Sequence, residues 1–538
     1  MTGGGLTLLL SAIVALALLA KRLKIPYPIV LVLGGLVLAL IPRMPVVELR
    51  PDLVFLLFLP ALIFGDGWTT DYRAFKRLYQ PIFMLAIGLV VFTSFAVAYV
   101  AHAMMGFPLA LGFVLGAILS PTDAVAADAI AEEVGLPSRM RTIIGGESLV
   151  NDATGLVLYR FAVVAVATGS FSLVAAAGQF VYVALAGVGV GLIVAWVIAK
   201  IMIGIRVLGL SDELIAVSIS LVTPFALYVP ADAIGASGVL AAMSGGMYLS
   251  RKSAQIFGPD ERIATANVWN LLFFVFNGAA FVLIGLQLRS IVRGLDQHSF
   301  LTTTGWGVAI AFVVIVVRIA WIFPGTYVRR WVWPKIRERE GPDPPWTAVL
   351  VAGMAGMRGI VSLAAALALP DRVAGGAPFP QRNLILFITF VVILVTLVGE
   401  GLAMPWLIRR FRIGAAEDTS GTASAARVRL AEAALERLRS LESAFATPLE
   451  WEVAGRIQAE YEERIAHFKA HLEGIDPEED QHQHDVARRL WREARAAERA
   501  ALNELRRQGQ ITDDLYREIQ WDIDLAEARS VKEAHARS

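Results

Sequence analysis

The stretch Gly145-Gly-Glu-Ser-Leu-Val-Asn-Asp152 lies within an apolar segment, residues 141–167, that is long enough to cross a membrane. An ionisable side chain deep in such a segment costs about 2.5–3.5 kcal/mol on insertion scales, so it requires a partner or a function. On a helix, Glu147 lies beside Asn151, and Ser148 lies beside Asp152, because each pair is four residues apart. The stretch therefore predicts a membrane helix that carries a short polar stripe.

The rest of the chain has the composition of a membrane protein with a water-soluble tail. Its 538 residues are 56% hydrophobic and 18% charged, whereas a typical soluble domain is about 25% charged. Residues 1–412 contain 30 Lys and Arg against 21 Asp and Glu, and residues 413–538 contain 18 against 26. The absence of cysteine excludes disulfides, zinc–thiolate sites, iron–sulfur clusters and thiol catalysis. These features argue against a soluble enzyme and predict a transmembrane domain over 1–412 and a helical cytoplasmic tail over 413–538. We expect the tail to open with a linker of small residues over 414–426 and its helical pattern to break over 474–485.

Thirteen stretches are apolar enough to be membrane spans, which need roughly 20 residues each. They are residues 5–20, 25–42, 51–69, 78–104, 108–133, 141–167, 172–204, 212–230, 233–249, 263–289, 300–328, 345–370 and 382–408. Alternate connections, with the segment after the last span, hold 21 Lys and Arg, whereas the others hold six. Because cytoplasmic loops are enriched in Lys and Arg, we expect the amino terminus outside and the tail inside. The first stretch could instead be a cleaved signal peptide, but its positive residues follow it, as in a membrane anchor.

The polar stripe has two interpretations. It could be a structural hydrogen-bond patch, or it could be a site for a hard cation such as Na⁺, with oxygen ligands from Asp152 and Ser148. The neighbouring span supports a site, because Pro121 must break its helix near 117–121. Irregular backbone at membrane depth persists only where it lines a cavity or is buried in protein. We therefore expect free carbonyl groups, the Thr122 hydroxyl and the Asp123 carboxylate to face a cation.

A second broken helix is predicted in the stretch Gly353-Met-Ala-Gly-Met-Arg-Gly359, since glycine permits unwound backbone. If six-span halves repeat around the seventh span, the two breaks fall at matching places, a pattern typical of a transporter's midplane site. Arg358 needs a counter-ion, and we expect Glu147 to provide it in a structural pair. Arg318 and Arg160 also lie in apolar stretches, where each is either functional or an interface residue whose charged end reaches the headgroups.

Three strings resemble those of bacterial sodium/proton antiporters: Ser-Pro-Thr-Asp (120–123), Gly-Glu-Ser-Leu-Val-Asn-Asp (146–152) and Gly-Met-Arg-Gly (356–359). They are similar to the branch of the monovalent cation:proton antiporter family that is marked by an Asn-Asp pair. The similarity covers nearly the whole chain, including Leu505-Arg-Arg-Gln-Gly-Gln-Ile-Thr-Asp513 in the tail. The expected fold is thus an all-α polytopic membrane protein of about 13 helices, with inverted repeats and two broken crossing helices.

The resemblance also implies a homodimer in the plasma (inner) membrane, in contact with lipids and without a cofactor or nucleic-acid partner. A mobile core part would contain residues 108–167 and 345–408, and a dimerisation part the remaining spans. Asp152 would carry Na⁺ or H⁺ in turn, assisted by Ser148 and Thr122, and the Asn-Asp pattern is associated with electroneutral one-for-one exchange. In relatives, the equivalent of Asn151 supports the unwound segments, and the equivalents of Glu147 and Arg358 pair. Relatives often place a Glu after the aromatic residue of the third span, where this chain has Gly65 and then Asp66, so Asp66 is a candidate accessory ligand.

The mechanism that we expect is competition between Na⁺ and H⁺ at Asp152. A free Asp carboxyl titrates near pH 3.9, but desolvation disfavours the charged form of a carboxyl group, which lets a proton compete with a cation. Li⁺ or K⁺ could replace Na⁺, and a potassium/proton antiporter or a cation-coupled solute symporter remains an alternative. A channel is less consistent with two broken helices, and an intramembrane hydrolase lacks a histidine deep in a span. Regulation by the tail, with or without a binding partner, is a further hypothesis.

Overall fold

The computed structural model describes residues 3–42, 49–123, 125–127, 136–169, 173–295, 299–332, 343–373, 376–411, 413, 419–473, 477–508, 510, 515–516, 519–520 and 523. The chain divides into two compact units, Met1–Ala415 and Ala416–Ser538. The first unit contains every stretch that was predicted to span a membrane, and the second corresponds to the acidic tail.

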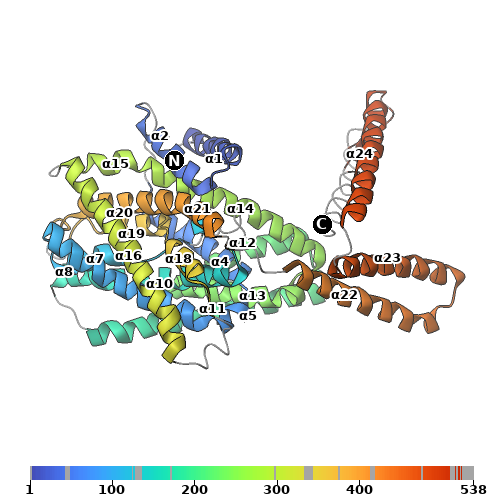
Figure 1. Cartoon of the computed structure of the whole chain (residues 1–538), viewed down its shortest axis with the longest axis horizontal. Helices are drawn as coiled ribbons and strands as arrows, with labels where there is room; N and C mark the ends of the chain where they lie inside the picture. The colour runs from blue at the N-terminus through green and yellow to red at the C-terminus, as the bar shows by residue number, and fades with distance from the viewer. Residues whose placement is uncertain are drawn as a thin grey trace. The chain divides into compact units, whose positions relative to one another are not determined.

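The first unit consists of helices, many of which continue one another (Figure 1). In chain order they are α1 (Gly3–Leu23), α2 (Tyr27–Leu40), α3 (Pro51–Leu53), η1 (Val54–Phe58), α4 (Leu59–Thr69), α5 (Tyr72–Arg77), α6 (Tyr79–Phe83), η2 (Met84–Leu89), α7 (Val90–Met105), α8 (Leu109–Leu119), α10 (Ser138–Thr168), α11 (Leu173–Val207), α12 (Glu213–Ala233), α13 (Gly238–Ile256), α14 (Pro259–Leu286), α15 (Leu288–Arg293), α16 (Phe300–Val332), α18 (Trp346–Met354), α19 (Ile360–Leu367), α20 (Arg382–Leu394), η3 (Val395–Glu400) and α21 (Gly401–Phe411). Among the described residues, eight helical stretches are long and apolar enough to cross a membrane, and α2 and α8 are shorter apolar helices. Each of the thirteen predicted stretches overlaps a helix, while the number of crossings stays a prediction.

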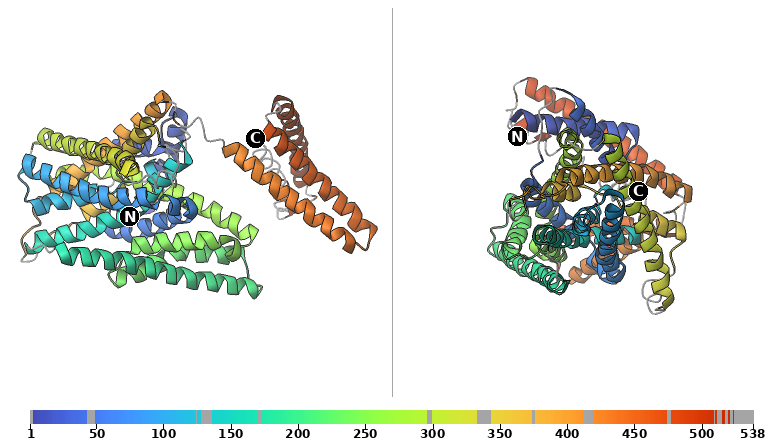
Figure 2. Two further views of the ribbon diagram at one scale, coloured as in Figure 1. Left: turned by 60° about the horizontal axis from the view of Figure 1, so that its bottom comes forward. Right: turned by 90° about the vertical axis from the view of Figure 1, so that its left-hand side faces the viewer.

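The helices of this unit pack in two neighbouring groups. In one group α11, α12 and α13 contact one another, α13 packs on α4, and α14 packs on α2. Figure 2 shows α11 to α14, coloured teal to green, side by side. In the other group α8 lies between α7 and α10, and α16 packs on α7, α18 and α20. The ranges 108–167 and 345–408 contact each other through α8, α10, α19 and α20, and their role as a mobile core stays a prediction.

Two helical stretches of the second group are interrupted, as the sequence predicts. Helix α8 ends at Leu119, and residues 120–123 are not helical, because Pro121 has no N–H to donate and disfavours the preceding turn. Helix α18 ends at Met354 and α19 begins at Ile360, so residues 355–359 are unwound. The first break lies slightly later than the expected 117–121.

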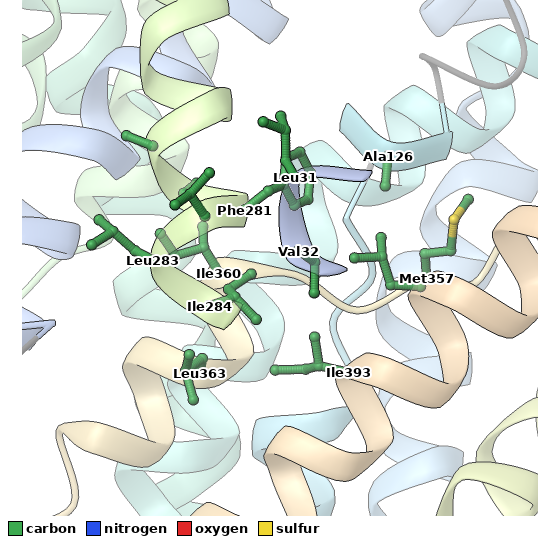
Figure 3. Close-up of a cluster of buried hydrophobic side chains, with 14 of the residues drawn as sticks. Leu31, Val32, Ala126, Phe281, Leu283, Ile284, Met357, Ile360, Leu363 and Ile393 are labelled. Atoms are coloured by element: carbon green, nitrogen blue, oxygen red, sulfur yellow. The ribbon is translucent and has the colours of Figure 1, made fainter. Parts of the chain in front are cut away.

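The second break is enclosed by apolar side chains. Figure 3 shows Met357 of this segment and Ile360, the first residue of α19, in one apolar cluster with Phe281 of α14 and Ile393 of α20. Both Met357 and Ile393 are fully buried. The unwound backbone is therefore shielded within protein, which is the condition under which irregular backbone persists at membrane depth.

The second unit contains α22 (Thr419–Leu441), η4 (Glu442–Ala444), α23 (Pro448–Glu473) and α24 (Pro477–Arg507). Helices α22 and α23 form an antiparallel hairpin (Figure 1), in which Leu435 and Phe468 are buried. Two sequence-based expectations are wrong here. The predicted linker over 414–426 is helical from Thr419, and the predicted break over 474–485 is helical from Pro477. Proline is favourable as the first helical residue, and the acidic residues that follow it favour a helix amino terminus.

Candidate ion-binding site

The two unwound segments cross and touch through their backbones. The Asp123 N–H donates a hydrogen bond to the Met357 carbonyl at 2.8 Å. A Cβ atom at position 359 would overlap the Asp123 carboxylate, so only glycine permits this approach. Asp123 is fixed by its own chain, because its Oδ1 accepts a hydrogen bond from the Val125 N–H at 2.9 Å. Pro121 and Gly359 thus place a carboxylate at the point where the two breaks meet.

The polar stripe of α10 faces the first unwound segment. The Ser148 hydroxyl donates to the Thr122 carbonyl at 2.8 Å, and Asn151 Nδ2 donates to the Thr122 hydroxyl at 2.7 Å. The Thr122 hydroxyl in turn donates to Glu147 Oε1 at 3.5 Å. Asn151 Oδ1 is buried and has no hydrogen-bond partner among the described residues. The stripe therefore holds the first unwound segment in place and leaves Asn151 Oδ1 available as a hydrogen-bond acceptor.

A small cavity of about 40 Å³ lies beside this crossing. Three carboxylates line it: Asp152 from α10, Asp123 from the first break and Asp66 from α4. Ser148 and Thr122 contribute hydroxyl groups to the same cavity. Oxygen atoms are the ligands that a hard monovalent cation requires. The volume of the cavity is enough for one or a few species of the size of a water molecule. The structure thus brings together Asp152, Ser148, Thr122, Asn151, Asp123 and Asp66, all predicted from the sequence.

The expected pair of Glu147 and Arg358 is wrong. Glu147 is held by Arg318 from α16, with Nη1 to Oε1 at 2.5 Å and Nη2 to Oε2 at 2.8 Å. This paired geometry matches the fork of a guanidinium to both carboxylate oxygens. Arg358 instead donates from Nε to the Leu119 carbonyl at 3.0 Å and from Nη1 to the Gly356 carbonyl. Arg358 therefore ties the carboxyl end of α8 to the second unwound segment through their carbonyl groups.

The remaining two candidates have different environments. Arg318 is 1% exposed, so the alternative that it reaches the membrane interface is wrong. Arg160 does not line the cavity and forms an ion pair with Asp232 at 3.3 Å, with side-chain exposures of 58% and 43%. Its placement agrees with a residue at an interface and gives it no contact with the cavity.

Sequence analysis missed two polar residues near the crossing. Asn277 of α14 lines the cavity. Glu400 of η3 is 1% exposed, and neither of its carboxylate oxygens has a hydrogen-bond partner among the described residues. The sequence feature that could have identified Glu400 is its position as an isolated acid in the apolar range 382–408, where any ionisable residue suggests a function.

Comparison with known proteins identifies the family. The family described as "Sodium/hydrogen exchanger, transmembrane" matches residues 8–410. An uncharacterized Na⁺/H⁺ exchanger of Mycobacterium tuberculosis is 33% identical over 532 residues, which cover 98% of this chain and 96% of the relative. A sodium, potassium, lithium and rubidium/H⁺ antiporter of Bacillus subtilis is 34% identical over 408 residues, covering 74% of this chain and 60% of the relative.

The fold is also similar to that of a solved structure. The sodium proton antiporter MjNhaP1 of Methanocaldococcus jannaschii superposes with a TM-score of 0.60 at 18% identity, covering 78% of this chain and all of that chain. The family resemblance drawn from the three sequence strings is thereby confirmed, as is the expectation of a multi-pass membrane protein. The chain belongs to the sodium/hydrogen exchanger family, which consists of membrane transporters and not of enzymes.

Proposed function

We propose that this chain exchanges Na⁺ for H⁺ across the membrane by alternating access, with the cation and the proton competing for Asp152. The observation that carries the proposal is the position of Asp152, which lines a small cavity at the crossing of two broken helices. Ser148 and Thr122 would complete the oxygen ligands of Na⁺, and Asp123 and Asn151 would support them. A site neutralised by either Na⁺ or H⁺ moves through an apolar barrier at lower cost than a charged one, which couples the two fluxes.

Asp66 supports this assignment as an accessory acid. It comes from α4, which packs on α13, whereas Asp152 comes from α10, which packs on α8. Both line one cavity, so a cation there is attracted from both groups of helices. A change in the relative position of the groups would change how closely Asp66 approaches the ion.

The size of the cavity favours an ion over an organic solute. About 40 Å³ is far below the roughly 300–1,000 Å³ of typical small-molecule sites. This observation supports antiport over the alternative of a solute symporter. The name of the B. subtilis relative includes potassium and lithium as well as sodium, so K⁺/H⁺ and Li⁺/H⁺ exchange belong to the same proposal.

The wider arrangement belongs to the proposal as well. Thirteen crossings in inverted repeats would place the amino terminus outside and the tail over 413–538 in the cytoplasm, in a homodimer of the plasma (inner) membrane. The exchange would be electroneutral, since one carboxylate holds either one Na⁺ or one H⁺. Such exchange would contribute to pH homeostasis, and the tail would regulate it.

The test is cation-driven proton flux in everted vesicles that lack other antiporters. Wild type and Asp152→Asn are titrated with Na⁺, Li⁺ and K⁺, and Asp232→Asn serves as a matched control because Asp232 is an exposed acid outside the cavity. Flux in the wild type and the control, but not in Asp152→Asn, is the expected result. Undiminished flux in correctly inserted Asp152→Asn would refute competition at this carboxylate.

A further inference from the structure

Four buried charges that do not line the cavity lie around the second break. Glu147, Arg318, Arg358 and Glu400 come from α10, α16, the unwound segment 355–359 and η3, and each is 1% exposed. Glu147 and Arg318 satisfy each other in a direct ion pair. Arg358 and Glu400 are therefore the pair of charges that is not joined by such contact.

Glu400 lies on the face of its helix that touches the unwound segment. Thr396 precedes it by four residues and thus shares its face, and the Thr396 hydroxyl accepts a hydrogen bond from the Arg358 N–H at 3.3 Å. The same hydroxyl donates to the Val392 carbonyl of α20 at 2.9 Å, and this bond fixes the orientation of the Thr396 side chain. Arg358 and Arg318 are the positively charged groups close enough to interact with the Glu400 carboxylate.

The helix is locally distorted at this place. Residues Val395–Glu400 form a π-helical turn between α20 and α21, and π-helical turns inside helices occur frequently at functional sites. Both oxygens of Glu400 lack a hydrogen-bond donor among the described residues. A buried carboxylate without donors is costly unless a nearby positive charge compensates it.

We propose that Glu400 is a positioning residue of the ion site, whose carboxylate balances the charge of Arg358 without contact and so sets the electrostatic potential at the crossing. This inference rests on the proposed function, because its effect is read through cation binding. With both glutamates ionised, the four charges sum to zero, and the crossing is neutral apart from the aspartates that bind the cation. Removal of the Glu400 charge leaves one uncompensated positive charge beside these aspartates.

The sign of the effect follows from this charge. An extra positive charge repels Na⁺ and favours the deprotonated form of nearby carboxyl groups. In Glu400→Gln we therefore expect the half-saturating Na⁺ concentration to rise about five- to tenfold, and the pH profile of exchange to move toward acid by about one unit. Glu400→Asp keeps the charge and should retain the wild-type profile.

The two variants separate a charge role from a packing role. Glutamine has the size of glutamate, so a purely structural role predicts that Glu400→Gln behaves as wild type and the shorter Glu400→Asp is impaired. Glu261→Gln is the matched control for loss of a buried acid, since Glu261 accepts hydrogen bonds at 2.7 Å from Ser211 and from the Gly258 N–H. This control should leave the pH profile unchanged.

Proton flux in everted vesicles, measured over a series of pH values and Na⁺ concentrations, distinguishes the charge role of Glu400 from a packing role. A wild-type profile in folded Glu400→Gln overturns the proposal, as does the same shift in Glu400→Asp. If Glu400→Gln does not accumulate, the double variant Glu400→Gln with Arg358→Gln is tested, because it restores the charge balance. Recovery of folded protein in the double variant supports the proposal. Failure of the double variant to recover folded protein overturns it. Asp152→Asn, measured in parallel, tests the antiport mechanism separately, so the two failures can be told apart.

Discussion

Both carboxylate oxygens of Glu147 are held by the guanidinium of Arg318, at 2.5 and 2.8 Å, in a pair that is almost completely buried. The pair joins α10, which carries the polar stripe, to α16. A third element is joined as well, since Arg318 Nη2 also donates to the Ala352 carbonyl of α18 at 3.4 Å. The ion pair is therefore a structural support of the site and contributes no ligand to the cavity.

Loss of one partner of this pair is expected to destabilise the protein strongly. Glu147→Gln or Arg318→Gln leaves a buried charge without compensation, which costs about 3–5 kcal/mol. Thermal unfolding of the detergent-solubilised protein measures this loss. Arg160→Gln is the control, because its exposed pair with Asp232 is worth only about 0–1 kcal/mol. Equal midpoints for Glu147→Gln and wild type would contradict the role of the pair.

Replacement of Gly359 by alanine should abolish transport. The added Cβ would overlap the Asp123 carboxylate, so the two unwound segments would have to separate. We expect at least a tenfold loss of Na⁺-driven proton flux in inserted Gly359→Ala. Gly189→Ala is the matched control, because a Cβ at that helical position meets no atom within 4 Å. Normal flux in Gly359→Ala would show that the close approach is dispensable.

The Thr122 hydroxyl connects two parts of the site and should be needed for tight cation binding. It accepts from Asn151 at 2.7 Å and donates to Glu147 at 3.5 Å. Thr122→Val removes both bonds and leaves the Asn151 amide unpaired, at a cost of about 1–3 kcal/mol. The half-saturating Na⁺ concentration should rise, whereas Thr122→Ser, which keeps the hydroxyl, should remain close to wild type. If the valine variant binds Na⁺ as tightly as the serine variant, the hydroxyl is not a ligand.

Competition at one carboxylate predicts a definite pH dependence of cation affinity. When the proton form predominates, each unit of decrease in pH should raise the half-saturating Na⁺ concentration about tenfold, because one H⁺ is displaced by one Na⁺. The maximal rate at saturating Na⁺ should not follow this slope. Flux titrations at several pH values measure both quantities, and a slope near two would instead indicate two protons for each cation.

The start of α23 should be sensitive to acid. Glu450 Oε2 accepts hydrogen bonds from the N–H groups of Thr447 and Ala446 at 2.8 and 2.7 Å, in a capping arrangement. These bonds lower the pKa of Glu450, so they stabilise the folded state above the ordinary pKa of glutamate. The stabilisation is lost as the pH falls through the lowered pKa. Hydrogen exchange of the full chain should show early loss of protection at the start of α23 on acidification. Glu450→Gln should reduce protection there at neutral pH, whereas the exposed Glu463→Gln should not.

The sequence predicted the two breaks because local chemistry determines them. Pro121 cannot continue a helix, and Gly356 and Gly359 permit unwound backbone, so both breaks could be placed without knowledge of the fold. The polar stripe from Glu147 to Asp152 was equally accessible, since helical periodicity alone puts its residues on one face.

The partners of the buried charges could not be predicted in the same way. Arg318 and Arg358 are both single arginines in apolar stretches, and the local sequence does not show that Arg318, and not Arg358, contacts Glu147. Glu400 could not be recognised in the same way, because no neighbouring motif marks it. In the tail, a break was expected over 474–485, yet Pro477 begins a helix.

The crossing of the two unwound segments places Asp123 and Arg358 where their charges act on the helix dipoles. A helix carries about half a positive charge at its amino end and half a negative charge at its carboxyl end. Arg358 Nε donates to the Leu119 carbonyl at the carboxyl end of α8, and the Asp123 carboxylate lies against Gly359 at the amino end of α19. Each broken helix thus supplies the charge that neutralises the dipole of the other. The paired ends therefore lower the cost of holding two broken helices in a low-dielectric surrounding, and under the proposed mechanism a bound ion would be the main charge left to neutralise in transit.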